Sequence, residues 1–158
     1  MALLPIEKGE SNKILRGECA KITKIDKKLC KLLDDMKDTM FAARGVGLAA
    51  PQIGLNIRVV VCCFNYDTDH QAVVDMINPE ILEMGDEMVT IEEGCLSIPG
   101  QYKELARHKT ATVKFTDRKG REQVLKLKGF NARIVQHEVD HINGYLYVDR
   151  VREAEKNH

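Results

Sequence analysis

A five-residue pattern, His137-Glu138-Val139-Asp140-His141, restricts the local fold more than any other feature of this 158-residue chain. It lies in a segment from Phe130 to Ile142 with helical spacing, and Gly144 follows where a helix would end. Four residues of helix turn about 400° and rise about 6 Å, so the two imidazoles leave one face close enough to bind one metal. Glu138 projects from the flank of that face, where it can act as general base on a metal-bound water.

A third metal ligand is expected, because catalytic zinc-type sites have three protein ligands and one open position. The downstream histidine of HExxHxxGxxH peptidases is absent, since Tyr147 occupies its position. Upstream, Cys95 lies in a loop-forming segment bounded by Gly94 and Pro99, from which a thiolate can face the helix across a cleft. We therefore predict Cys95 as the third ligand. The other cysteines are predicted to be small buried hydrophobic residues: Cys19, Cys30, Cys62 and Cys63.

The remaining patterns predict an α+β domain with antiparallel or mixed sheets around the C-terminal helix. Apolar residues recur at three- and four-residue steps from Ile25 to Phe41, which predicts an N-terminal amphipathic helix. The glycine- and proline-containing stretch from Gly45 to Gln52 is predicted to be a close-packed loop. Strands are predicted at residues 57–64, 72–77, 87–91, 105–115 and 122–127. The charged tail after Asp149 is predicted to be a surface helix end, without an assigned function.

Composition excludes several classes of protein. The 24 Lys and Arg residues balance 24 Asp and Glu residues and are interspersed with them, which disfavours a nucleic-acid partner. The longest apolar run, Val59 to Phe64, is far shorter than the roughly 20 residues of a transmembrane helix, so no membrane association is expected. The N-terminus does not have the pattern of a secretory signal, and five cysteines at irregular spacing do not form a disulfide framework. A cytoplasmic location is expected.

Three segments resemble, in order and spacing, the motifs of the peptide deformylase family. They are Gly45-Val46-Gly47-Leu48-Ala49-Ala50-Pro51-Gln52-Ile53, Glu93-Gly94-Cys95-Leu96-Ser97 and Gln136-His137-Glu138-Val139-Asp140-His141. The resemblance extends over nearly the whole chain and implies one catalytic domain over residues 1–158. It also implies a metal-dependent amide hydrolase that removes the N-formyl group from the formyl-methionine of nascent polypeptides and releases formate.

Carried onto this sequence, the resemblance assigns individual roles. Cys95, His137 and His141 bind the metal, and Glu138 is the general base and then the general acid. The Gln52 side-chain NH₂ and the Leu96 backbone N–H stabilise the developing oxyanion. The metal is expected to be Fe(II) in the cell, whereas Zn, Ni or Co can replace it in isolated protein because the same ligands accept all of them.

The expected substrate is an N-formyl-methionyl peptide, which the family binds like an added strand. Gly45 and Gly47 permit close approach of the peptide backbone. Val46, Phe130 and Ile134 are candidates for an apolar methionine pocket, with plain core packing as the alternative. A transient contact with the ribosome is also expected, because the substrate emerges there. Arg44 and Tyr102 depart from the familiar pattern and leave the peptide preference beyond methionine open.

Two other functions are considered. A zinc endopeptidase also uses HExxH, but the missing downstream ligand and the upstream Cys95 count against it. A non-catalytic paralogue would bind metal or a formylated peptide without turnover. The presence of Glu138, Gln52 and Cys95 argues against such a degenerate copy.

Overall fold

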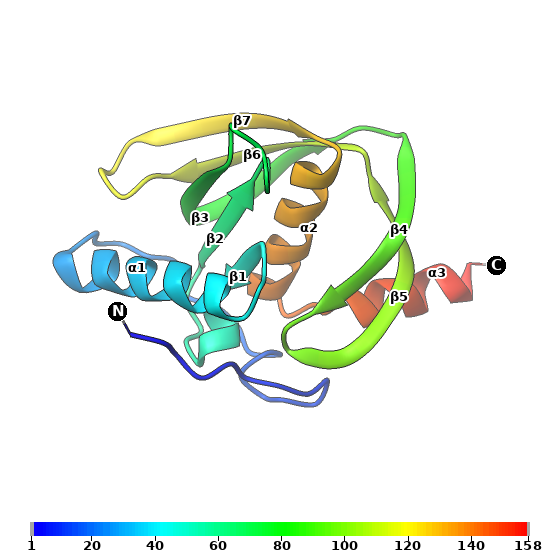
Figure 1. Ribbon diagram of the computed structural model, residues 1–158, viewed down its shortest axis with the longest axis horizontal. Coiled ribbons are helices and arrows are strands. Elements are labelled where there is room, and N and C mark those ends of the chain that lie inside the picture. Colours follow the sequence, from blue (N-terminus) through cyan, green and yellow to red (C-terminus); the bar gives the residue numbers. More distant parts are fainter. Residues whose placement is uncertain (1, 158) are drawn as a thin grey trace.

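The computed structural model describes residues 2–157 and has the expected α+β architecture, with helices on both sides of antiparallel strands (Figure 1). Helix α2 lies near the centre of the molecule, between a larger sheet and a curved two-stranded hairpin. In chain order the elements are α1 (Lys27–Ala42), β1 (Gly47–Ala49), the 3₁₀ helix η1 (Ala50–Ile53), β2 (Val59–Phe64), β3 (Ala72–Met84), β4 (Met88–Cys95), β5 (Ile98–His108), β6 (Thr110–Thr116), β7 (Glu122–Lys128), α2 (Phe130–Ile142) and α3 (Tyr147–Lys156).

The larger sheet has five antiparallel strands in the order β1-β2-β3-β6-β7. All six residues of β2 are buried, because helices cover both faces of the sheet at this strand. Since side chains alternate between the faces of a strand, Val60 and Cys62 pack in one cluster with α2. Val59 and Val61 pack in a second cluster with α1. The sheet therefore gives α2 a rigid base.

The smaller sheet is the β4–β5 hairpin, which curves along the other side of α2 (Figure 1). Gly94 pairs with Tyr102, and a register shift follows before Cys95 pairs with Ile98. A third apolar cluster joins this hairpin to α3 and to the N-terminal segment. Its buried members are Leu15, Ile98, Leu105, Leu146, Tyr147 and Val148. The turn that carries Cys95 is thus held from outside the larger sheet.

The two predicted helices are confirmed. Helix α2 spans Phe130–Ile142 as expected, and Gly144 follows it with a φ of 81°, a left-handed conformation that glycine adopts without strain. Helix α1 begins at Lys27, because the Asp26 carboxylate caps it by accepting a hydrogen bond from the Leu29 N–H at 2.8 Å.

Strand predictions were wrong where the chain passes from one sheet to the other. The segment from Leu105 to Phe115 was expected to be one strand, but β5 ends at His108 and β6 begins at Thr110 in the larger sheet. Lys109 separates them, and its carbonyl accepts a hydrogen bond from the Gly129 N–H at 2.8 Å. The alternation of side chains does not reveal that the hydrogen-bonding partner changes.

Two smaller expectations need correction. The Gly45–Gln52 loop contains strand β1 and the start of η1, because its backbone pairs with β2. The charged tail after Asp149 is the exposed end of α3, as expected, and the buried residues of this helix, Tyr147 and Val148, precede it; residue 158 lies outside the described residues. Cys19, Cys62 and Cys63 are buried as predicted, but Cys30 is only half-buried.

None of the described helices combines the length and the apolar character that a membrane-spanning helix requires.

Candidate active site

Helix α2 and the β4–β5 hairpin together form a Cys/His/His metal-binding site. One helical turn separates His137 from His141, and their Nε2 atoms are 3.2 Å apart. The Cys95 Sγ atom lies 3.3 Å from His141 Nε2. The three ligand atoms all lie within 4.8 Å of one another, so the predicted ligands converge on one point.

This donor set fits a divalent transition metal. One thiolate sulfur and two imidazole nitrogens are ligands typical of zinc and of other first-row divalent ions. Three protein ligands leave a coordination position for water or substrate. A cavity of about 390 Å³ borders Cys95 and His137, so two of the three ligands face an open space.

Glu93 orients His137. Its Oε1 atom lies 2.6 Å from His137 Nδ1, and the Arg107 and Arg133 guanidiniums donate to the same carboxylate at 2.7–2.8 Å. Burial alone would raise the pKa of Glu93, but hydrogen bonds from Arg107 and His137 hold it well below its usual range. An ionised carboxylate only accepts hydrogen bonds, so His137 Nδ1 carries the proton and Nε2 is left to bind the metal.

The buried charged network continues to the C-terminal helix. Arg107 also donates to Asp140 at 3.0 Å, and Arg150 of α3 donates to both Asp140 oxygens at 2.8 and 3.2 Å. Arg107, Arg133 and Asp140 are all buried. The network connects β4, β5, α2 and α3, so it fixes the hairpin relative to the histidines.

The two histidines have opposite electrostatic environments. Burial and the neighbouring His137 lower the pKa of His141 well below its usual range, which favours the neutral form that a metal ligand must have. Burial would also lower the pKa of His137, but Cys95 and Glu93 raise it instead. A metal therefore competes with a proton mainly at His137.

Glu138 is nearly enclosed, with 4% of its surface exposed. Burial raises its pKa to about 7, although the nearby His137 opposes the shift. Its Oε1 atom has no hydrogen-bond partner among the described residues, and Glu138 lines the same cavity as His137. A carboxyl group with a pKa near neutrality can both accept and return a proton.

Gly47 explains how β1 passes so close to Glu138. A Cβ atom at Gly47 would lie 2.3 Å from Glu138 Oε2. At Gly45, a Cβ atom would lie 2.9 Å from the terminal Cδ1 of Leu96. Each glycine therefore makes room for a side chain of the site. This explains the absence of a side chain at both positions independently of the predicted approach of a peptide.

The Gln52 side chain is held at both ends and is 2% exposed. Its Oε1 atom accepts a hydrogen bond from the Ala49 N–H at 2.9 Å, so its NH₂ group points toward the hairpin. There it donates to Ser97 Oγ at 3.2 Å and lies 3.8 Å from Cys95 Sγ. Leu96, between these two hairpin residues, lines the cavity.

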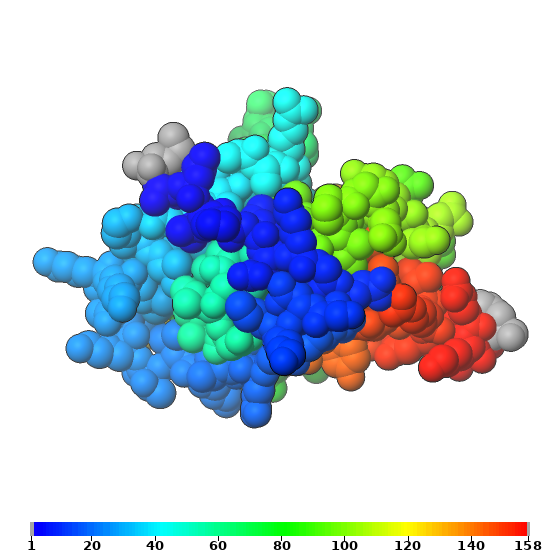
Figure 2. Space-filling view, turned by 90° about the horizontal axis from the view of Figure 1, so that it is seen from below, coloured from blue at the N-terminus to red at the C-terminus, as the bar shows by residue number. Residues whose placement is uncertain are grey.

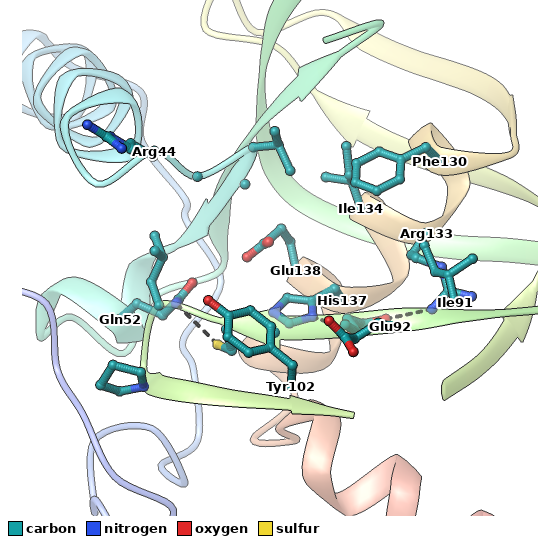
Figure 3. A pocket seen from close by; sticks show the side chains of 18 of the residues that line it. Arg44, Gln52, Ile91, Glu92, Tyr102, Phe130, Arg133, Ile134, His137 and Glu138 are labelled. Atoms are coloured by element: carbon teal, nitrogen blue, oxygen red, sulfur yellow. Dashed lines mark hydrogen bonds and ion pairs between the residues drawn. The ribbon is translucent and has the colours of Figure 1, made fainter. Parts of the chain in front are cut away.

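The predicted pocket residues also line this cavity (Figure 3). Phe130 and Ile134 come from the first two turns of α2, and Val46 comes from the segment before β1 and packs against the cluster that contains Ile134. Phe130 is 52% exposed, which is too open for a core residue, whereas Ile134 is buried and also belongs to the core. The aromatic ring of Tyr102 stands at the cavity with 64% of its surface exposed.

Four residues of the site had no predicted role: Glu93, Arg107, Arg133 and Ser97. Glu93 was quoted in the second motif, and its place two residues before Cys95 on the same strand was a usable signal. Arg107 lies inside the strand predicted at residues 105–115. A charged residue in such an apolar pattern suggests a buried partner of opposite charge. Its two partners, Glu93 on β4 and Asp140 on α2, become apparent only when the hairpin packs against α2.

Comparison with known proteins gives consistent matches. The family model described as polypeptide deformylase matches residues 4–157. A peptide deformylase of Prochlorococcus marinus (strain AS9601) is 46% identical over 138 residues, which cover 87% of this chain and 69% of that protein. Peptide deformylase 1 of Bacillus cereus is 44% identical over 151 residues, 96% of this chain and 94% of that protein. The crystal structure of peptide deformylase from Thermotoga maritima is similar with a TM-score of 0.88 and 39% identity, covering 95% of this chain and 98% of that chain.

Proposed function

Because the chain belongs to the polypeptide deformylase family, and so is an amide hydrolase that removes the N-formyl group from nascent peptides, we propose how its own residues divide the reaction. Cys95, His137 and His141 hold one divalent metal, and Glu138 transfers the proton. Gln52 and the Leu96 N–H stabilise the oxyanion. The observation that carries this assignment concerns the Glu138 carboxylate, which lines the cavity beside the converging ligands. Its Oε1 atom has no hydrogen-bond partner in the described part of the chain.

The three ligands fit the metal by chemistry and by position, since one soft sulfur and two neutral nitrogens converge. When bound, the metal supplies Lewis acidity, which lowers the pKa of water and polarises a carbonyl. Glu93 keeps the His137 ring in the required orientation by accepting its Nδ1 proton.

Glu138 accepts a proton from the attacking water as the water adds to the formyl carbon. It then returns the proton to the amine as the carbon–nitrogen bond breaks, which releases formate and a free N-terminus. A pKa of about 7 suits both steps, because the group gives up and takes the proton at similar cost. Its enclosure by Gly47 and α2 keeps the carboxylate in place.

Gln52 is prepared to donate to the oxyanion, since the Ala49 N–H fixes the direction of its amide. The substrate oxygen would replace Ser97 Oγ or share the NH₂ group with it, because that group has two hydrogens. The Leu96 N–H lies next to Cys95 in the chain and is the second proposed donor. A pre-oriented donor stabilises the transition state without reorganisation.

The methionine side chain is proposed to enter between Val46 and Phe130, with Ile134 as the base of the pocket. These residues line the cavity, and all are apolar. Gly45 and Gly47 are proposed to bind the peptide backbone along β1. The exposed fraction of Phe130 supports a binding role over core packing.

Fe(II) is the metal that we propose for the cell, with Zn, Ni or Co in isolated samples, because the Cys/His/His set accepts each of them. We also propose that the chain acts as one catalytic domain, since its three apolar clusters all border the site elements. Its proposed place of action is the cytoplasm, at the ribosome, where formylated N-termini emerge. The balanced charge supports no direct nucleic-acid specificity.

The test is formate release from a formyl-Met-Ala-Ser peptide by anaerobically purified protein, with metal content measured on the same sample. We expect formate without backbone cleavage at one metal per chain. The variant Glu138→Gln should keep the metal and lose about 10³-fold in kcat, because general acid–base catalysis contributes 10²–10⁴-fold. Near-native kcat in that variant would remove Glu138 from its role, and backbone cleavage would favour the endopeptidase.

A further inference from the structure

The active site has two halves, the larger sheet with α2 and the β4–β5 hairpin, and the N-terminal segment before α1 runs from one half to the other. Residues 4–9, the N-terminal strap, lie outside every helix and strand. Figure 2 shows this dark-blue segment between the teal residues of the Gln52 region and the yellow-green residues of β5. The Leu4 N–H donates to Thr39 Oγ1 at 3.0 Å, which attaches the start of the strap to α1.

Two backbone hydrogen bonds join the strap to the residues beside the metal ligands. The Glu7 N–H donates to the Gln52 carbonyl at 2.6 Å, and the Gly9 N–H donates to the Ser97 carbonyl at 2.9 Å. Gln52 belongs to η1, after the edge strand of the larger sheet, whereas Ser97 lies in the turn of the β4–β5 hairpin. Only Lys8 separates the two donors, so the strap sets how far apart these segments lie.

The strap, Gln52 and Ser97 are joined into a closed ring of hydrogen bonds. The Gln52 side chain donates to Ser97 Oγ at 3.2 Å, while the strap holds the backbone carbonyls of the same two residues. Gln52 and Ser97 are both buried, so water does not replace a lost contact easily. The Glu7 side chain is held in turn, because Asn12 Nδ2 donates to its carboxylate at 2.9 Å.

We propose that Glu7 and Gly9 are positioning residues, whose two backbone N–H groups fix the distance between the Gln52 amide and the Leu96 N–H. This inference rests on the proposed oxyanion role of those two donors. No strap residue lines the cavity, and none hydrogen-bonds to the side chain of a metal ligand among the described residues. Its loss should therefore lower kcat, while metal content and KM stay close to their original values.

Ordinary substitutions test this poorly. Gly9 has a φ of 103°, which proline cannot adopt and which strains any other side chain. Replacing a single backbone amide by an ester removes the N–H and leaves the side chain unchanged. The native Cys19 makes this feasible, because a synthetic thioester of residues 1–18 can be ligated to residues 19–158 and the full chain refolded with metal.

The experiment compares three ester variants with the all-amide ligated chain. Esters at Glu7 and at Gly9 each remove one bond of the strap. An ester at Lys8 is the matched control. Lys8 lies outside the helices and strands, and its N–H donates no backbone hydrogen bond to any described residue. Ni(II)-loaded protein is used for formate release from formyl-Met-Ala-Ser, and Zn(II)-loaded protein for NMR of the Gln52 side-chain NH₂.

We expect the Glu7 and Gly9 esters to lower kcat by about tenfold, because a displacement of about 1 Å at a reacting centre can cost 10²-fold. KM should stay within about twofold, metal content should remain one per chain, and the Gln52 NH₂ signals should shift. The Lys8 ester should match the all-amide chain. In a Gln52→Ala background the Glu7 ester should have little further effect, since both changes act on the same donor.

Unchanged kcat in both esters, together with a slow Gln52→Ala variant, would overturn the strap proposal and leave the role of Gln52 intact. An equal loss with the Lys8 ester, or an undiminished loss in the Gln52→Ala background, would also overturn it. Wild-type kcat in Gln52→Ala would instead refute the proposed oxyanion role, and the strap proposal with it.

Discussion

Helix α2 and the β4–β5 hairpin contribute metal ligands in different ways. In α2 the two histidines are one turn apart on a helix packed against the five-stranded sheet. In the hairpin, Cys95 follows a register shift at the end of β4, and its position depends on contacts with other parts of the chain. The helical pair is a local structure, whereas the thiolate is placed by tertiary contacts.

The two sides of α2 also differ in where charge is buried. The α2 face toward the sheet is apolar, with Val135, Val139 and Ile142 in one cluster. The α2 face toward the hairpin carries Arg133 and Asp140, which pair with hairpin residues. Ion pairs are directional, so this side fixes the hairpin in one position more specifically than apolar packing would.

The largest expected effect comes from removing the hairpin's ligand. Cys95→Ala should reduce metal content to far below one per chain and abolish formate release, because two histidines alone bind weakly. Helix α2 should remain folded, since its apolar contacts do not involve Cys95. Metal analysis and circular dichroism measure both. Cys30→Ala, a half-buried cysteine of α1, is the control, and a full metal complement in Cys95→Ala would contradict the assignment.

The next largest effect is expected from breaking the buried ion pairs of Glu93, which connect the hairpin to α2. Glu93→Gln leaves Arg107 and Arg133 buried without their shared carboxylate, which should cost about 3–5 kcal/mol of unfolding free energy. Metal affinity should fall about 10–100-fold, because His137 loses its partner. Denaturant unfolding and metal competition measure these effects. The neighbouring exposed Glu92→Gln should change stability by no more than about 0.5 kcal/mol, and similar losses in both variants would refute the network.

A smaller effect is expected from closing the gap between β1 and α2. Gly47→Ala places a methyl group against the enclosed Glu138 carboxylate, so we expect about 1–3 kcal/mol of destabilisation and a lower kcat. Gly45→Ala meets only the flexible end of Leu96 and should cost less. Thermal unfolding and formate release rank the two. If Gly45→Ala is the more damaging, β1 does not position Glu138 as described.

The smallest effect lies outside both halves. Burial would raise the pKa of Asp149, but Arg16 and the Leu146 N–H lower it, so Asp149 stabilises the fold above its ordinary pKa of about 4. This contribution is lost as the pH falls through the lowered pKa. Asp149→Asn should cost about 1 kcal/mol at pH 7 and less near pH 3, with kcat unchanged. A stability difference that does not shrink with acid would refute the ion pair with Arg16.

The regular elements were predictable to the extent that their signal is local. Helix α2 matches its expected bounds, because apolar spacing and Gly144 are read from adjacent residues. The division between β5 and β6 at Lys109 was not predictable, since both sides continue the same alternation while their partner strands differ. The strand predicted at residues 72–77 extends to Met84 as β3. Its second half forms because it pairs with β6, which is a tertiary contact.

The site residues likewise fall into those that the sequence predicted and those that depend on tertiary contacts. The motif residues His137, Glu138 and His141 follow from helical geometry. Cys95 was predicted because a third ligand was required and its segment forms a loop, whereas Gln52 follows from the resemblance to a known family. Arg107 and Arg133 could not be assigned to Glu93 from the sequence, because they lie 14 and 40 residues away from it. Charge pairing at such separations depends on which elements are adjacent in space.

The sequence by itself determined that two imidazoles share one face of a helix, because a step of four residues has a fixed rotation and rise. It also determined the apolar faces that drive each element into the core. Only the tertiary structure decided where the Cys95 thiolate meets those imidazoles, which carboxylate orients His137, and how residues 4–9 join Gln52 to Ser97. Those contacts connect residues far apart in the chain, and their geometry exists only once both sheets have packed around α2.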